Sequence, residues 1–473
     1  MVHAFRMKEK YIVLDVNSGC VHDVDKLCYD IIQAYCQSGR MPQADLDSDI
    51  EGALSADYPI AELRDAYQDI YALVQAEQLF SPDTYESLAL NMKKRSPVKA
   101  MCLHVSHDCN LRCKYCFADE GAYHAKRELM SAETGKRAMD FLIANSGKRR
   151  NLEVDFFGGE PLMNFEMVKE VVAYAREQEK LHDKHFRFTI TTNGLLLDDA
   201  KLDFINRHMS NVVLSLDGRK EVNDRLRCRA DGSGSYDSIV PKFQKVAESR
   251  GQDNYYVRGT FTKYNLDFSK DVLHLADLGF QQTSVEPVVC GEKTDYSLSE
   301  EDLPRIFEEY ETLVTAYLNR KKQGRGFQFF HFMIDLDQGP CVIKRLSGCG
   351  AGCEYLAVAP NGDIYPCHQF VGTEEYKMGS LEDGIVRPDI RETFESCNVY
   401  TKPKCRDCFA KFYCSGGCLA NACLINGDIN TPHELSCEMQ RKRVECSLYA
   451  KAVEADMAAE QTAAGGETHG GTL

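Results

Sequence analysis

The sequence predicts an α/β protein whose core is a partial (β/α)6 TIM-like barrel. Short apolar segments alternate with amphipathic helical patterns over residues 99–297, which is typical of parallel β/α units. Glycine and polar residues follow these segments, at the strand ends where a barrel collects its ligands. The patterns before and after this region differ, and 473 residues exceed the usual size of one domain. We therefore expect additional domains on both sides of the barrel.

A smaller domain is expected before the barrel. Apolar residues alternate in two short segments around Asn17-Ser18-Gly19, which predicts a β-hairpin. Two amphipathic helices are expected next, because apolar residues recur at helical spacing over residues 24–35 and 60–74. These elements predict a domain of residues 1–90.

The barrel is expected to contain six strands, and Ser131 is placed to cap a helix after the first of them. Residues 298–340 predict a charged helical bridging segment, and residues 341–448 a cysteine-dense domain. Residues 458–473 are rich in Ala, Gly and Thr without apolar periodicity, which predicts a disordered tail. The six expected strands are residues 100–105, 152–157, 186–191, 212–216, 256–261 and 283–287.

Charge and composition argue against several classes of function. The formal net charge is −16 and the pI is near 5.4, whereas affinity for nucleic acid or an anionic membrane needs a basic face. No apolar stretch approaches the roughly 20 residues that span a bilayer, and the N-terminus has no apolar signal core. We expect a cytoplasmic protein without nucleic-acid or membrane partners, in which many of the 21 cysteines bind metal rather than form disulfides.

Three cysteines follow the first strand: Cys109, Cys113 and Cys116, with Tyr115 directly before the last. Four thiolates would saturate a cubane iron–sulfur cluster, whereas three leave one iron open. A zinc site that lacks one ligand and a chance group of buried thiols are the alternatives. The spacing and the aromatic residue resemble radical S-adenosylmethionine (SAM) enzymes, in which the open iron binds SAM. The resemblance implies a 4Fe–4S cluster on these three cysteines.

The next three strands end in segments that resemble the SAM-binding parts of that family. Gly158-Gly159-Glu160-Pro161 follows the second strand, and Asn223-Asp224-Arg225-Leu226-Arg227 resembles a family segment with Asn223 in place of histidine. Arg227 would pair with the SAM carboxylate. Ordinary turns are the alternative. The resemblance implies SAM contacts from Gly158, Gly159, Glu160, Pro161, Asn193, Ser215, Asp217 and Arg227.

The C-terminal cysteines form the second pattern. Cys349 and Cys367 are followed by Cys405-x2-Cys408-x5-Cys414-x3-Cys418 and then by Cys437. This order resembles the SPASM extension of radical SAM peptide-modifying enzymes, which holds two auxiliary 4Fe–4S clusters. Cys349, Cys367 and Cys418 match ligands of the first auxiliary cluster, and its fourth ligand is Cys341, Cys353 or an open position. A pair of zinc ribbons is the alternative. The resemblance assigns to the second auxiliary cluster Cys405, Cys408, Cys414 and Cys437.

His368 directly follows Cys367 and is the one candidate catalytic residue. In sulfatase-maturing relatives, an Asp at this position is proposed to accept a substrate proton. Histidine keeps a candidate base but weakens the case for that reaction. A hydrogen bond to a cluster sulfide or a backbone carbonyl is the alternative role.

The segments around Cys349 and Cys367 resemble one subgroup, the maturases of small peptides with six cysteines in forty-five residues. This resemblance implies a thioether-forming enzyme with SAM and three 4Fe–4S clusters. Its partners would be a cysteine-rich precursor peptide with a leader and an electron donor such as flavodoxin or ferredoxin. The N-terminal hairpin and helices are similar to a winged-helix-like element that captures a leader peptide as an added strand.

Other functions stay open at this point. A sulfatase maturase that makes formylglycine and a peptide crosslinker that joins carbon to carbon are the alternative enzymes. A zinc-binding peptide adaptor is the alternative without catalysis. The sequence does not determine which peptide residues are joined, how many crosslinks form, the physiological reductant or the oligomeric state.

Overall fold

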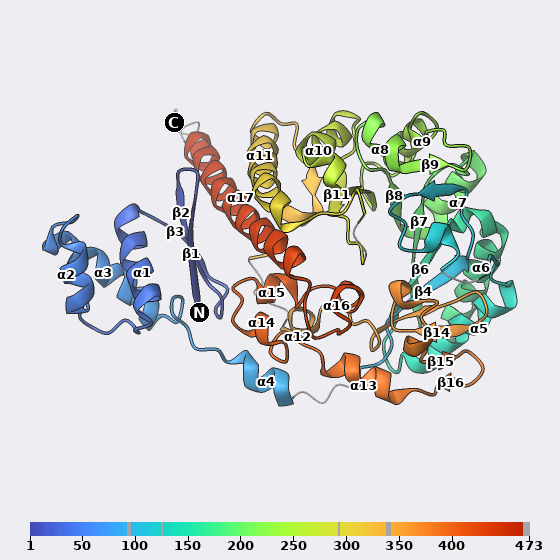
Figure 1. Ribbon diagram of the computed structural model, residues 1–473, viewed down its shortest axis with the longest axis horizontal. Helices are drawn as coiled ribbons and strands as arrows, with labels where there is room; N and C mark the ends of the chain where they lie inside the picture. The colour runs from blue at the N-terminus through green and yellow to red at the C-terminus, as the bar shows by residue number, and fades with distance from the viewer. Residues whose placement is uncertain (92–95, 124–125, 292–293, 337–341, 467–473) are drawn as a thin grey trace, which may run out of the picture.

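The computed structural model describes residues 1–91, 96–123, 126–291, 294–336 and 342–466. Figure 1 shows the N-terminal sheet and helices at one end of the molecule and the large α/β core at the other. The long helix α17 (Glu434–Gly466) runs from the C-terminal cysteine-rich region to the N-terminal sheet. No helix among the described residues is long and apolar enough to cross a bilayer.

The N-terminal unit is a three-stranded antiparallel sheet followed by helices. The predicted hairpin is confirmed as β2 and β3, and the two predicted helices are confirmed as α1 and α3. The sequence pattern does not predict β1, because His3 and Arg6 interrupt its apolar residues. The elements are β1 (Val2–Met7), β2 (Lys10–Asp15), β3 (Val21–Val24), α1 (Lys26–Ser38), α2 (Ser48–Leu54), α3 (Ile60–Gln75) and α4 (Tyr85–Asn91).

Both faces of this sheet are buried, because side chains along β2 alternate between two cores. Val13 packs with Ile31 and Tyr67 of the N-terminal helices. Ile12 and Leu14 instead belong to the main core of the molecule. The N-terminal unit therefore packs directly against the rest of the chain and is not joined to it by a linker alone.

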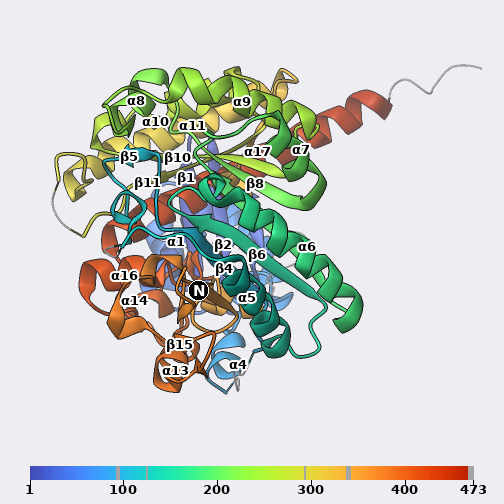
Figure 2. The same ribbon diagram turned by 90° about the vertical axis from the view of Figure 1, so that its right-hand side faces the viewer.

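All six predicted barrel strands are confirmed, and they form one parallel sheet in the order β4-β6-β7-β8-β10-β11. Figure 2 shows α5 and α6 covering the outer face of this sheet. Ser131 caps α5 as predicted, because its Oγ accepts a hydrogen bond from Thr134 N at 3.0 Å. The two ends of the sheet do not pair with each other in the described residues, so the barrel is open.

The strands of the barrel are β4 (Ala100–Ser106), β6 (Asn151–Gly158), β7 (His185–Thr192), β8 (Met209–Ser215), β10 (Tyr255–Phe261) and β11 (Gln282–Pro287). The helices between and after them are α5 (Ala132–Asn145), α6 (Phe165–His182), α7 (Asp199–His208), α8 (Lys220–Leu226), α9 (Tyr236–Ser249), α10 (Phe268–Asp277) and α11 (Leu303–Lys322).

Later segments extend both edges of the barrel sheet. β12 (Gln328–Phe329) pairs in parallel with β11, and β13 (Tyr355–Val358) pairs in parallel with β4. The cysteine-rich region therefore continues the barrel sheet, which places its cysteines beside the barrel interior. Its other elements are β14 (Asp363–Tyr365), β15 (Gly379–Ser380), β16 (Gly384–Ile385), α12 (Val342–Ser347), α13 (Pro388–Ser396), α14 (Pro403–Arg406), α15 (Lys411–Cys414) and α16 (Leu419–Asn426).

The C-terminal tail differs from the expectation of disorder over residues 458–466, which continue α17 to Gly466. Alanine is the strongest helix former, and alanines dominate this part of the chain. A helix that is already nucleated propagates at little cost, so the tail needs no apolar stripe of its own. Residues 467–473 lie outside the described residues.

We expect the central strand β6 to be sensitive to loss of volume. Phe156 is fully buried and its ring stacks on Phe188 with centroids 5.5 Å apart. Phe156→Ala removes this packing and leaves a cavity, which should lower the free energy of unfolding by about 3–5 kcal/mol. Leu181→Ala is the control, because Leu181 is 73% exposed. Denaturant titration of the two variants measures the difference, and equal losses would contradict the assignment of Phe156 to the core.

Candidate active site between the barrel and the cysteine-rich region

The three cysteines of the first motif line one cavity of about 150 Å³ beyond the end of β4. Cys113 lies in β5 (Leu111–Cys113), and its partner in the antiparallel pair with β9 (Arg227–Arg229) is Arg227. This short strand pair fixes Arg227 beside the cysteines. Burial raises the pKa of the Cys109 thiol to about 11 and that of Cys113 to about 12. Binding of iron must therefore displace the thiol protons.

Two glycines let the cysteine loop, residues 106–116, pack directly against the end of β6. Gly158 has φ +127°, and a Cβ there would lie 2.3 Å from the backbone oxygen of Ser106. A Cβ on Gly159 would lie 2.2 Å from the oxygen of Asp108. The amide of Gly159 donates to Ser106 O at 2.7 Å, and that of Glu160 donates to Asp108 O at 2.9 Å. Larger residues would push the cysteine loop away from the strand.

Glu160 joins the ends of β6 and β7. Its side chain is 1% exposed and accepts hydrogen bonds from Thr192 Oγ1 at 2.7 Å, Asn193 N at 2.8 Å and Leu162 N at 3.0 Å. Burial still raises the pKa of this carboxyl above its ordinary value. Glu160 lines the cavity, whereas Pro161 does not and instead begins the short helix Pro161–Asn164.

Asn193 and Ser215 line the same cavity from the ends of β7 and β8. The Nδ2 of Asn193 donates to Asn110 Oδ1 at 2.8 Å and lies 3.6 Å from the sulfur of Cys109. The predicted SAM contacts on three strands and the cysteine loop thus converge on one space.

Tyr115 forms a buried network with Arg227 and Asp217, which no pattern in the sequence predicts. Its hydroxyl donates to Asp217 at 2.7 Å and accepts from Arg227 Nη1 at 2.8 Å. Thr260 N also donates to Asp217 at 3.1 Å. Burial raises the pKa of Asp217, and the charge of Arg227 opposes that rise. Asp217 does not line the cavity, so its contact with SAM stays a prediction.

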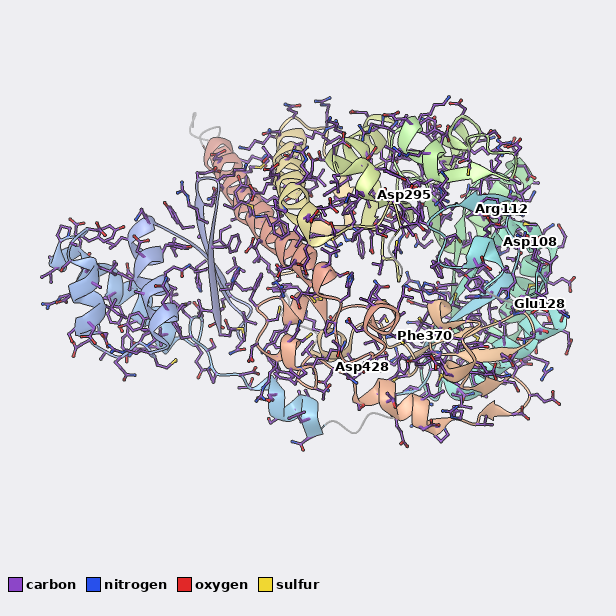
Figure 3. All side chains as sticks on the ribbon, in the orientation of Figure 1. Asp108, Arg112, Glu128, Asp295, Phe370 and Asp428 are labelled. Carbon is purple, nitrogen blue, oxygen red and sulfur yellow. The ribbon has the colours of Figure 1, made fainter. Side chains whose placement is uncertain are left out.

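A chamber of about 670 Å³ lies next to this cavity, between the barrel and the cysteine-rich region. Its walls include Cys414, Cys418 and Cys437 of the C-terminal motif. Figure 3 labels Arg112 on the cysteine loop, and Phe370 and Asp428 in the cysteine-rich region. The chamber and the smaller cavity share the lining residues Tyr115, Phe117, Phe157, Thr191, Ser215 and Arg227.

Several of the C-terminal cysteines lie close to one another. The thiolates of Cys349 and Cys418 add to burial in raising the pKa of Cys367, to about 12, which indicates that these three side chains are close. Cys353 is buried, and Cys341 lies outside the described residues. A second, small cavity is lined jointly by Cys405, Cys408, Cys414 and Cys437.

The donor chemistry of these groups fits iron–sulfur clusters, which are bound by cysteine thiolates. Within the described ranges, no three His, Cys, Asp or Glu side chains are arranged to hold a single metal ion. A cubane cluster spreads its ligands over different irons, so thiols around a shared cavity are the arrangement that it needs. The assignment of each cysteine to a cluster stays a prediction.

His368 is largely buried and lines the chamber. Its Nδ1 lies 3.4 Å from the hydroxyl of Tyr355, and its ring packs on Phe157 with centroids 5.1 Å apart. Burial, with the charge of Arg258 adding to it, lowers the pKa of His368 to about 4. The side chain is therefore neutral at physiological pH in this structure.

The chain is similar to several known proteins. Residues 103–257 match the family model described as the radical SAM superfamily. A curated relative, the cysteine-type anaerobic sulfatase-maturating enzyme of Clostridium novyi, is 24% identical over 330 residues, which cover 67% of this chain and 86% of that protein.

Two solved structures share the fold. The structure of anSMEcpe with bound AdoMet has a TM-score of 0.61 at 18% identity and covers 76% of this chain and 99% of its own. Streptococcus suis SuiB bound to the precursor peptide SuiA has a TM-score of 0.51 at 17% identity and covers 89% of this chain and 95% of its own. The chain therefore contains a radical SAM domain over residues 103–257.

Proposed function

We propose that this protein is a peptide maturase that forms thioether crosslinks, each between a cysteine sulfur and a carbon atom of one precursor peptide. The lining of the chamber is the observation that supports this proposal. We call the cavity lined by Cys109, Cys113 and Cys116 the SAM cavity. The chamber walls combine residues of the SAM cavity, such as Ser215 and Arg227, with Cys414, Cys418 and Cys437. A peptide in this space would meet the radical-generating site and the C-terminal cysteines together.

Within this proposal, Cys109, Cys113 and Cys116 bind the 4Fe–4S cluster and the strand ends around them bind SAM. When bound, the cluster and SAM supply a 5′-deoxyadenosyl radical that removes a hydrogen atom from the substrate. Arg227 is suited to hold the SAM carboxylate, because its buried Nε has no hydrogen-bond partner among the described residues. Tyr115 and Asp217 keep the guanidinium of Arg227 in place.

Two auxiliary 4Fe–4S clusters complete the proposed site. Cys349, Cys367 and Cys418 would hold the first and leave a position for Cys341, Cys353 or a substrate thiolate. The second would use the four cysteines around the small cavity. Metal coordination lowers the pKa of a thiol, which suits a reaction at a cysteine sulfur.

The N-terminal unit is the proposed winged-helix-like site for a leader peptide. β3 lies at the edge of the three-stranded sheet, where an extended peptide can add as a further strand. The SuiB structure, which is bound to a precursor peptide, supports a peptide substrate. A flavodoxin or ferredoxin is the proposed electron donor, in the cytoplasm.

Formylglycine formation is the second candidate function, because the relative from Clostridium novyi is named a sulfatase-maturating enzyme. His368 weighs against it. It stands where sulfatase-maturing relatives carry an Asp, so the residue proposed to accept the substrate proton in that reaction is replaced here. A cysteine-rich peptide therefore fits better than a sulfatase.

The proposed function predicts the mass change of a cysteine-rich precursor peptide. Anaerobic incubation with the reconstituted enzyme, SAM and reductant should remove two hydrogens per crosslink and one alkylatable thiol per crosslink. Mass spectrometry after reduction and alkylation measures both losses. A peptide that loses hydrogens but keeps all of its thiols would contradict thioether formation and favour carbon–carbon crosslinking, whereas formylglycine would give its own mass change.

Cys113→Ala should abolish cleavage of SAM to 5′-deoxyadenosine, since the cluster loses one of three ligands. The iron content should fall by about four atoms from the roughly twelve that three cubane clusters contain. Cys290→Ala is the control, because Cys290 lines none of these cavities. Iron analysis and chromatography of the SAM products measure the two effects, and SAM cleavage by Cys113→Ala would refute the cluster assignment.

A further inference from the structure

A polar row crosses the chamber side of the barrel sheet, outside the SAM cavity and the cysteine groups. Cys102 of β4, Asp155 of β6 and Thr189 of β7 are neighbours in register, with Cys102 opposite Asp155 and Asp155 opposite Thr189. All three side chains line the chamber. Tyr355 of β13 lies beside Cys102 and also lines the chamber. The row therefore faces the space that the peptide would occupy.

Asp155 is the ionisable group of this row that titrates near neutral pH. Burial raises the pKa of its carboxyl to about 7, the charge of Glu153 adds to this rise, and a hydrogen bond from Thr189 opposes it. In the described part of the chain, no Lys, Arg or His forms an ion pair with Asp155. Asp155 can therefore gain or lose a proton without breaking a salt bridge.

The thiol and the phenol hydroxyl of this row do not titrate near pH 7. Burial holds the pKa of the Cys102 thiol and of the Tyr355 hydroxyl well above their ordinary values. Glu153, on the same strand, is paired with Arg187 of β7 at 4.0 Å.

The other chamber side chains that could accept a proton form ion pairs or polar contacts with neighbouring residues. Glu286 lies 3.5 Å from Arg258 and 3.8 Å from His331, and these charges hold its pKa below the ordinary value. His433 is hydrogen-bonded to Ser436 at 2.8 Å. His368 follows the predicted cluster ligand Cys367, and its Nδ1 lies 3.4 Å from the hydroxyl of Tyr355.

Thioether formation requires that the donor cysteine lose its thiol proton and that the acceptor carbon lose a hydrogen atom. The one electron left when sulfur joins carbon needs an acceptor, which an auxiliary iron–sulfur cluster would supply when bound. Resting on the proposed function, we propose that Asp155 accepts the thiol proton of the donor cysteine in the peptide. The S–H bond breaks, its electron pair stays on sulfur, and an O–H bond forms on Asp155. The proton then leaves through the chamber. A free thiol has a pKa of about 8.5, close enough to that of Asp155 for this transfer.

The test compares the pH dependence of crosslinking in wild type and variants. Crosslinking by wild type should fall as the pH drops through about 7, because only the carboxylate form of Asp155 accepts a proton. Asp155→Asn should lower the rate at least about 100-fold and remove this acidic limb. Asp155→Glu should restore part of the rate.

Glu153→Gln is the matched control, because it removes the same charge two positions away on the same strand. It should keep the maximal rate and move the acidic limb to lower pH, since the charge of Glu153 raises the pKa of Asp155. Difference infrared spectra of wild type against Asp155→Asn give a readout apart from turnover. A protonated carboxyl band should disappear as the pH rises through about 7.

The outcomes separate this inference from the proposed function. If the wild type forms thioethers and Asp155→Asn forms them at the same rate with the same acidic limb, the role of Asp155 is refuted and the proposed function stands. If the wild type cleaves SAM but every cysteine-rich peptide keeps its alkylatable thiols, both are refuted. An infrared band that does not titrate between pH 5 and 9 would also refute the role of Asp155.

Discussion

The geometry of the site depends on the close packing of the cysteine loop against the ends of β6 and β7. Two glycines, Gly158 and Gly159, let the loop backbone approach the strand, and amide hydrogen bonds hold it there. The buried carboxylate of Glu160 then binds the end of β7 through Thr192 and Asn193. A buried carboxylate without these partners would carry a large desolvation cost, so the strand ends and the loop must order together.

The open barrel produces the chamber. In a closed barrel of this type, inward side chains fill the interior in layers. Here the edge strand β4 pairs with β13 instead of closing the circle, and β13 leads into the cysteine-rich region. The inward side chains of β4, β6 and β7 therefore face the chamber, which lets polar residues such as Asp155 and Thr189 occupy positions that a closed core would give to apolar ones.

Buried polar contacts fix the N-terminal unit relative to this chamber. The Nζ of Lys411, whose side chain is 2% exposed, donates to Asp83 at 2.9 Å, and the hydroxyl of Tyr400 donates to the same carboxylate at 2.7 Å. The ring of His3 stacks on Phe409 with centroids 3.5 Å apart. Together with the sheet that is buried on both faces, these contacts hold β3 at a fixed position relative to the chamber, as the proposed leader-binding edge requires.

The sequence by itself determined the six parallel strands, the N-terminal hairpin, and the motifs that line the SAM cavity. These follow from local rules: apolar periodicity sets strands and helices, and the spacing of Cys109, Cys113 and Cys116 along one loop sets their proximity. Tertiary structure alone decided the pairing of β4 with β13, the burial of Asp217 away from the cavity, and the alignment of Cys102, Asp155 and Thr189 across three strands. Such contacts join residues far apart in the chain, and their register depends on how the whole sheet packs, which no local pattern records.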